Sequence, residues 1–190
     1  MAPSPPSPRA RLAELFAKVD AFFTRASAVH GPRITCHAGC ADCCRRRFSV
    51  TSLEASALTE ALAALPADRR GELAARAREG DPEVCPALDP DGRCAVYEAR
   101  PLICRTHGMP LRFPPPQGSR SLPVLDACPK NFAGEALTKL DPTTVLDQGT
   151  LSTVLGALDA AFSDEQGRGR GERIEIADVL ARDPASGQRS

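Results

Sequence analysis

Four thiols stand within nine residues of this chain, in the stretch Cys36–Cys44, "CHAGCADCC". Cys40 and Cys43 form a Cys-x2-Cys pair, the spacing with which many proteins hold zinc or an iron–sulfur cluster. The same pair could act as a redox dithiol, and buried free cysteines can also serve as small apolar side chains. The pattern therefore indicates metal ligation first, with redox thiols and inert core thiols as alternatives.

Geometry limits what these four thiols can do alone. In a helix they would share an arc of roughly 100°, which is also the width of an ordinary apolar stripe. Cys36 and Cys44 would then lie roughly 12 Å apart along the axis. Thiolates on one ion, each about 2.3 Å from it, must lie within roughly 4 Å of one another. Either the segment is a looped knuckle, or its thiols are shared between centres and completed from elsewhere in the chain.

The chain supplies enough further thiols to complete such a centre: Cys85, Cys94, Cys104 and Cys128. Eight thiolates suit two four-thiolate sites or one larger cluster. A thioredoxin-like pair would open a helix after a strand, and no βαβ pattern is present here. An even number of cysteines also suits disulfides, but no signal peptide is recognisable, so we expect a cytoplasmic protein with reduced thiols.

The cysteines fall into a longer ordered motif: Cys36-x3-Cys40-x2-Cys43-Cys44, then Cys85-Pro86, then Gly92-x-Cys94-x-Val96-Tyr97-x2-Arg100-Pro101-x2-Cys104-Arg105, and finally Cys128. This motif resembles the YkgJ-type cysteine-cluster family, the CxxCxxCC zinc- or iron-chelating domain, which also occurs in flagellin lysine N-methylase. The resemblance spans residues 36–128 and implies a bound metal centre, often iron–sulfur, with the cysteines as ligands. The methylase has substantially more chain than this protein, so the motif alone does not carry its activity over.

Cationic and aromatic residues accompany the thiols and could form a second shell around a metal. Two zinc ions on eight thiolates would move the formal charge from zero to about −4. The Arg45–Arg47 run, Arg100 and Arg105 lie beside candidate ligands and could offset that charge. Tyr97 and Arg100 are expected to brace the chain against the turn that carries Cys104, not to catalyse a reaction.

The three histidines differ in their relation to the thiols. His37 lies between two candidate ligands, and His107 follows Cys104 by three residues. Either imidazole could bind the metal or donate to a sulfur, with His107 the stronger candidate. His30, at a predicted helix end, is expected on the surface.

Apolar periodicity places the thiols between helices. A stripe from Leu12 to Ala26 predicts a helix that begins at Arg9 and ends near Gly31. Residues 51–65 begin with a capping box, and residues 67–80 form a second helix ending in glycine. A further stripe predicts a helix over residues 143–163.

Shorter elements join these helices. Residues 45–50 are expected to be extended, and residues 85–97 to form a small hairpin turning at Asp91-Gly92. Residues 98–108 should contain one or two helical turns with Pro101 near the start, and residues 174–181 a last short element. The expected fold is therefore mainly α with a small β-hairpin, as a compact irregular domain centred on metal.

The domain plan follows from composition. Residues 1–8 are expected to form a disordered Pro-rich arm, residues 9–182 a single cysteine-cluster domain with a metal-binding core at 36–128, and residues 183–190 a disordered tail. Lys and Arg balance Asp and Glu at 24 each, so we expect no attraction to nucleic acid. No run approaches the roughly 18 apolar residues of a membrane span. The abundance of Ala, Arg, Pro and Gly is typical of GC-rich bacterial genes.

These observations predict a metal-binding protein in which an iron–sulfur cluster is favoured over zinc. It would support redox or protein-modification chemistry together with a protein partner or substrate that the sequence does not name. A structural zinc module for protein contacts is the alternative, and a methylase-like enzyme a further one. The chain shows no nucleotide-binding signature and no interpretable Ser/His/Asp order, so no catalytic residue is assigned.

Overall fold

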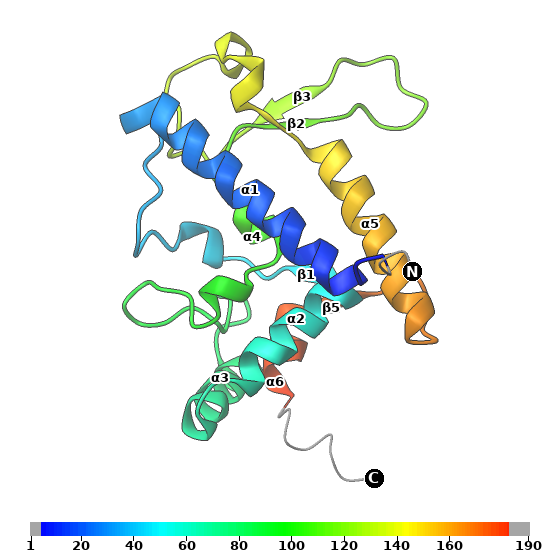
Figure 1. Ribbon diagram of the computed structural model, residues 1–190. Coiled ribbons are helices and arrows are strands. Elements are labelled where there is room, and N and C mark those ends of the chain that lie inside the picture. Colours follow the sequence, from blue (N-terminus) through cyan, green and yellow to red (C-terminus); the bar gives the residue numbers. More distant parts are fainter. Residues whose placement is uncertain (1–4, 183–190) are drawn as a thin grey trace.

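Helices make up most of this computed structural model, which describes residues 5–182 (Figure 1). The helices are α1 (Pro8–His30), α2 (Ser52–Ala63), α3 (Ala67–Glu79), α4 (Leu102–Thr106), α5 (Gln148–Glu165) and α6 (Ile176–Ala181). The strands are β1 (Ser49–Thr51), β2 (Leu111–Phe113), β3 (Val124–Asp126), β4 (Leu146–Asp147) and β5 (Arg173–Glu175). The predicted fold class, mainly α with small β elements, is confirmed. The predicted tail at 183–190 and residues 1–4 of the predicted arm lie outside the described residues.

The first helix positions the rest of the domain. It begins at Pro8, one residue before the predicted start, because the Ser7 Oγ accepts a hydrogen bond from the Ala10 N–H at 3.3 Å. Proline suits this first position, where its missing N–H would have no helical partner. The predicted apolar stripe packs against α2, α4 and α5, in a cluster of Leu12, Leu15, Phe16, Val19, Leu53, Leu102, Leu155, Leu158 and Phe162.

The predicted capping box at the start of α2 is present and also fixes α4. Glu54 accepts hydrogen bonds from the N–H and the hydroxyl of Thr51, both at 3.0 Å, and Thr51 accepts from the Glu54 N–H. The second carboxylate oxygen of Glu54 accepts from the N–H of Leu102 at 2.8 Å. Glu54 is buried, so one side chain holds the first turns of two helices together. Because α4 carries Cys104, this contact also sets the position of a candidate ligand.

A second core lies between α2, α3 and α6. Its buried members are Val50, Ala55, Leu58, Leu62, Leu73, Ala87, Val96, Ile176, Val179 and Leu180. Cys85 and Cys94 pack against this core from the loop that follows α3. The helix α3 ends at Glu79 with Gly80 as its cap, as predicted. The 85–97 loop therefore rests on a packed apolar base.

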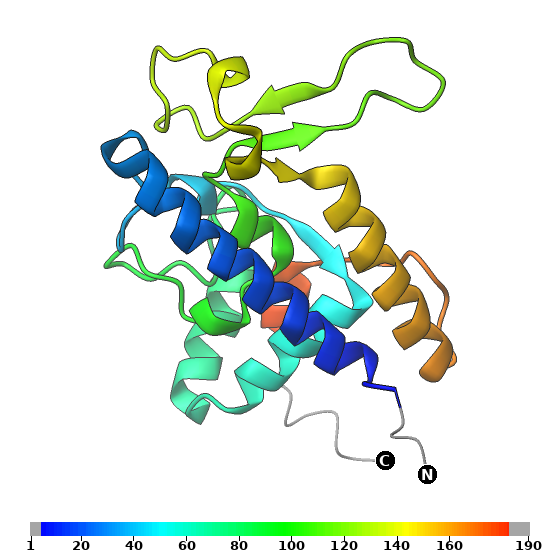
Figure 2. The same cartoon turned by 45° about the horizontal axis from the view of Figure 1, so that its top comes forward.

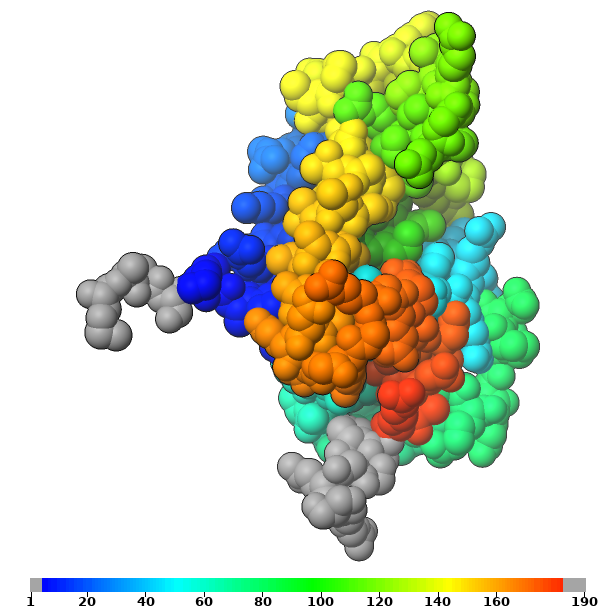
Figure 3. Space-filling model, turned by 90° about the vertical axis from the view of Figure 1, so that its right-hand side faces the viewer, coloured from blue at the N-terminus to red at the C-terminus, as the bar shows by residue number. Residues whose placement is uncertain are grey.

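The strands pair differently from the prediction. β1 pairs with β5 antiparallel, and β2 lies between antiparallel β3 and parallel β4. The predicted hairpin at 85–97 contains only one isolated bridge, between Leu88 and Cys94. The hairpin that does form joins β2 to β3, and Figure 3 shows it rising above α5. Sequence reasoning missed it because neither strand exceeds three residues.

The predicted helix over residues 143–163 begins later than expected, at Gln148. Residues 142–144 form a 3-10 turn, and Leu146–Asp147 join the sheet as β4. Asp147 then caps α5, since its Oδ1 accepts from the Thr150 N–H at 2.7 Å. No helix within residues 5–182 combines the length and apolarity needed to cross a membrane.

Candidate metal centre

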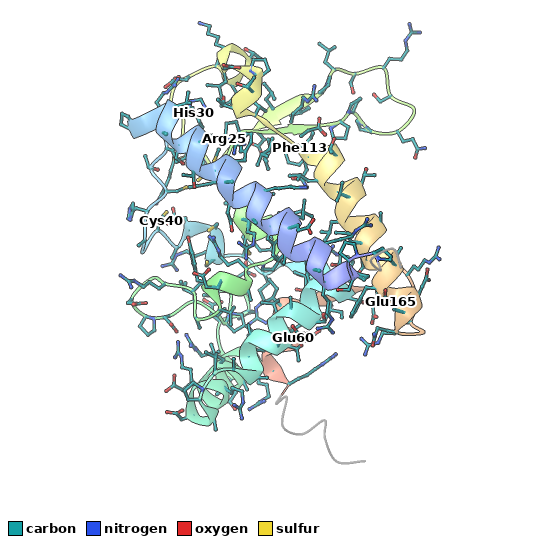
Figure 4. The ribbon with its side chains drawn as sticks, in the orientation of Figure 1. Arg25, His30, Cys40, Glu60, Phe113 and Glu165 are labelled. Atoms are coloured by element: carbon teal, nitrogen blue, oxygen red, sulfur yellow. The ribbon has the colours of Figure 1, made fainter. Side chains whose placement is uncertain are left out.

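The first cysteine run is a looped knuckle, not a helix. Its regular structure is one 3-10 turn, Asp42–Cys44, preceded by a turn in which the Cys40 N–H donates to the His37 carbonyl at 3.0 Å. Gly39 at that turn has φ +90°, a conformation that favours glycine. Figure 4 shows Cys40 on this loop after α1. The separation of roughly 12 Å that a helix would impose on Cys36 and Cys44 therefore does not apply to this loop.

The knuckle contacts the 85–97 loop along its backbone. The Cys85 N–H donates to the Cys44 carbonyl at 2.7 Å. At the other end Gly92 lies against Gly39, and a Cβ at Gly92 would stand 2.7 Å from the Gly39 carbonyl oxygen. In Figures 1 and 2 the two loops lie side by side, away from α5. The knuckle and the 85–97 loop are therefore in backbone contact, although Cys44 and Cys85 are 41 residues apart in the sequence.

Helix α3 anchors the 85–97 loop through Asp89. The Asp89 carboxylate accepts hydrogen bonds from Arg69 and from Arg76, the latter at 2.9 Å. Arg76 also donates to the Leu88 carbonyl. Burial acts to raise the pKa of Asp89, but the two arginines outweigh it and hold that pKa below its usual value. These contacts fix the loop between its two cysteines, Cys85 and Cys94.

The thiols can be divided into two sets according to which of them influence one another electrostatically. The first set surrounds Cys36: burial raises the pKa of its thiol, and the neighbouring thiolates of Cys128, Cys40 and Cys43 add to that effect. All four come from the knuckle and from the segment after β3. The first set is therefore Cys36, Cys40, Cys43 and Cys128.

The second set surrounds Cys104 on α4. Burial and the thiolates of Cys85 and Cys94 raise the pKa of Cys104 to about 12. The S–H of Cys44 donates to the Cys43 sulfur, which raises the pKa of Cys44, and Cys85 and Cys94 act on it in the same direction. The second set is therefore Cys44, Cys85, Cys94 and Cys104. Cys43 also acts on Cys104 and Cys85, so the two sets adjoin at the adjacent pair.

A cavity of about 410 Å³ opens beside the first set. Its lining includes five of the cysteines: Cys36, Cys40, Cys43, Cys104 and Cys128. Helix α1 forms another part of its wall through Asp20, Phe23 and Thr24. All eight cysteines are free thiols. Within residues 5–182, no three His, Cys, Asp or Glu side chains are gathered closely enough to enclose a metal ion as they stand.

Among the residues predicted to surround the metal ligands, Arg100 has the clearest electrostatic effect on the thiols. Its guanidinium acts electrostatically on Cys43, Cys94 and Cys104. It stacks over the Tyr97 ring, 3.5 Å from the centroid, and its Nε donates to the Tyr97 carbonyl at 2.9 Å. Tyr97 itself is 53% exposed. The pair braces the turn that precedes α4.

Arg105 lines the cavity together with the thiols and also contacts α1. Its guanidinium is buried, pairs with Asp20 and lies 4.3 Å from the centre of the Phe16 ring. Its Nε donates to the Arg100 carbonyl at 2.7 Å. The contacts with Asp20 and Phe16 hold the Arg105 guanidinium against α1. Arg105 therefore ties α1 to α4, and a role for it in offsetting thiolate charge stays a prediction.

The three histidines differ in burial and in their position relative to the cavity. His107 is half-buried, lines the cavity, and has its pKa lowered by burial and by Arg46. His37 is exposed at the cavity edge, with Nδ1 at 2.9 Å from the Ala38 carbonyl oxygen. The expectation that His30 is a surface residue is wrong, because His30 is buried against Phe132 at a ring distance of 4.9 Å.

One residue near the thiols escaped the sequence reasoning altogether. Asn131 is buried, and its side-chain amide donates to the Cys36 sulfur at 3.3 Å. It follows Cys128 by three residues, in "CPKN". Its position three residues after Cys128, a candidate ligand, was the only signal in the sequence. That position does not indicate the contact with Cys36, which depends on the fold.

The donor chemistry fits a metal that prefers sulfur. Thiolates select zinc, Cu(I) and iron–sulfur clusters, whereas hard cations such as Mg²⁺ and Ca²⁺ prefer oxygen. Eight free thiols in two adjoining sets, together with an amide N–H on a sulfur, supply such a donor set. The cysteines, and not the surrounding carboxylates, would hold the metal.

Comparison with known families supports this chemistry. Residues 35–122 match the family model described as "CxxCxxCC: Putative zinc- or iron-chelating domain". The matched segment contains seven of the eight cysteines and ends before Cys128. Searches of curated proteins and of solved structures gave no match. Residues 35–122, a little under half of the chain, are therefore similar to the CxxCxxCC family of zinc- or iron-chelating domains.

Proposed function

We propose that the eight cysteines hold a sulfur-ligated metal centre built from the first and second sets, with an iron–sulfur cluster favoured over zinc. The observation that carries this proposal is a single cavity lined by thiols of both sets: Cys36, Cys40, Cys43 and Cys128 from the first and Cys104 from the second. Cys43 acts on thiols of both sets, and Cys44 donates to it. Two separate closed zinc sites would not need such an overlap, whereas a polynuclear centre places ligands side by side.

Charge supports the same reading. Cysteine-ligated clusters are anionic, and their potentials respond to nearby charge and hydrogen bonds. Arg100 acts on thiols of both sets, and Arg47 and Arg76 act on Cys85. When bound, an iron–sulfur cluster would supply one-electron transfer at the wall of the cavity. The protein would then support redox or protein-modification chemistry in the reducing cytoplasm.

A structural zinc module is the second candidate. The knuckle and the 85–97 loop contain little regular structure of their own, with 3-10 turns and one isolated bridge. Segments of this kind often depend on a structural zinc for their fold. In that case the surface around the cavity would serve protein contacts.

Anaerobic purification tests the proposal. A brown protein that contains iron and acid-labile sulfide supports the cluster, whereas a colourless protein with zinc supports the structural module. A protein that binds neither metal through its thiols would contradict both. Cys40→Ser and Cys43→Ser should lose the same metal, and Cys44→Ser shows how the sets are joined: the same loss indicates one shared centre, whereas a different fraction indicates that the second set holds a centre of its own. Ala41→Ser, which adds a hydroxyl to the same knuckle without removing a thiol, should keep the full metal content.

A further inference from the structure

The side chain of Asn131 joins three separate segments at the edge of the first set. Its Oδ1 accepts hydrogen bonds from the N–H and the hydroxyl of Thr35, both at 2.9 Å. Its Nδ2 donates to the Gly108 carbonyl at 2.6 Å and to the Cys36 sulfur at 3.3 Å. Asn131 is 4% exposed, so these partners take the place of water.

This network fixes which end of the amide faces the sulfur. The Thr35 N–H can only donate, so it requires the carbonyl oxygen of Asn131 on its side. The Gly108 carbonyl can only accept, so it requires the amide nitrogen on the other. A flipped amide would oppose like groups at both places. The group that faces Cys36 is therefore an N–H donor.

The backbone holds this donor and the sulfur at a fixed distance. The Asn131 N–H donates to the carbonyl of Cys128, a member of the same set, at 2.8 Å. Gly108 has φ +98°, and a Cβ there would stand 2.6 Å from the Cys36 sulfur. The sulfur is thus enclosed by the Gly108 backbone on one side and by the Asn131 amide on another. A larger residue at position 108 would close this space.

We propose that Asn131 is a positioning residue of the metal centre, which donates an N–H to the Cys36 sulfur and so stabilises the metal-bound thiolate. The role rests on the proposed function, since it needs a metal on Cys36. Hydrogen bonds to ligand sulfurs strengthen metal binding and shift the reduction potential of clusters. Asn131 lies outside the matched family segment, which ends at residue 122. The chain after that segment therefore supplies both a ligand candidate, Cys128, and the donor that orients Cys36.

Titration of the metal-free protein with Co²⁺ and Zn²⁺ under anaerobic conditions tests this role. Asn131→Asp keeps the oxygen that Thr35 contacts but replaces the donor with an acceptor, and Asn131→Ala removes both. We expect each variant to bind Co²⁺ about tenfold or more weakly and to shift the sulfur-to-cobalt charge-transfer band. Thr35→Val removes the hydroxyl that donates to Asn131 and to the Lys130 carbonyl, but it keeps the Thr35 N–H and the bond to Cys36, so its band should match that of the wild type.

A double-mutant cycle separates this bond from a purely structural effect. In a Cys36→Ser background the sulfur is gone, so Asn131→Ala should cause little further loss of Co²⁺ affinity. An equal loss in both backgrounds, or an unchanged band in whichever Asn131 variant folds, would overturn the role of Asn131 alone. If the wild type itself binds neither ion through its thiols, the proposed function fails and this role fails with it.

Discussion

Replacing Gly92 with alanine should separate the two loops that carry six of the eight cysteines. Gly92 has φ +80°, and a non-glycine residue in this region costs about 1–2 kcal/mol. The alanine Cβ would also stand 2.7 Å from the Gly39 carbonyl oxygen, about 0.7 Å inside the 3.4 Å at which ordinary contact begins. The first cost is local, but the second forces the knuckle and the 85–97 loop apart.

The size of that displacement decides the outcome. Thiolate–metal distances hold to within about 0.2 Å, so a shift of several tenths of an ångström next to Cys40 disturbs a shared centre. Gly118 provides a matched control, with φ +79° and no atom within 4 Å of an added Cβ. Both alanine variants carry the same backbone penalty, and only Gly92→Ala adds the contact between the loops.

The assay is metal affinity and melting temperature for the two variants and the wild type, with and without metal. Gly92→Ala should bind metal at least about tenfold more weakly than Gly118→Ala, which corresponds to about 1.4 kcal/mol. Both should lose a similar amount of stability in the metal-free state if the loops relax there. Equal metal affinity in the two variants would show that contact between Gly39 and Gly92 does not position the thiols.

The remaining predictions concern metal, pH and charge. Chelation or cluster loss should lower the melting temperature by about 10 °C, because binding energy is folding energy, and an unchanged melt by calorimetry would contradict this. Asp89→Asn should destabilise the protein near neutral pH. The pKa of Asp89 is lowered in the folded protein. The loss of stability relative to the wild type should therefore be full above the unfolded carboxyl pKa of about 3.9 and should vanish as the pH falls through the folded value. A loss of stability that persists under acid conditions would argue against the Asp89–arginine contacts. Glu54→Gln should weaken the contact of α2 with α4 and cost about 1–3 kcal/mol in urea unfolding, whereas exposed Glu165→Gln should change little; equal effects would rule out the bridging role of Glu54.

Sequence patterns located the local elements well because those elements depend on neighbours along the chain. The stripe of α1 and the Thr51–Glu54 capping box each rest on residues within one or two turns of each other. The glycine that ends α3 is equally local. The start of α5 was placed too early because β2 recruits Leu146 and Asp147 into a sheet, and that partner lies more than thirty residues away. The short β2–β3 hairpin offered too few residues for a periodic pattern.

The sequence by itself determined the candidate donor atoms: eight thiols, seven of which lie in a segment similar to a metal-chelating family. Only the tertiary structure decided which segments meet around the thiols, with the knuckle in backbone contact with the 85–97 loop. It also decided that Asn131 donates to Cys36 across 95 residues and that His30 is buried. The physical reason is that a thiol's chemistry is a property of the side chain, whereas its neighbours depend on the path of the whole chain. Contacts at such separation leave no periodic trace in the sequence.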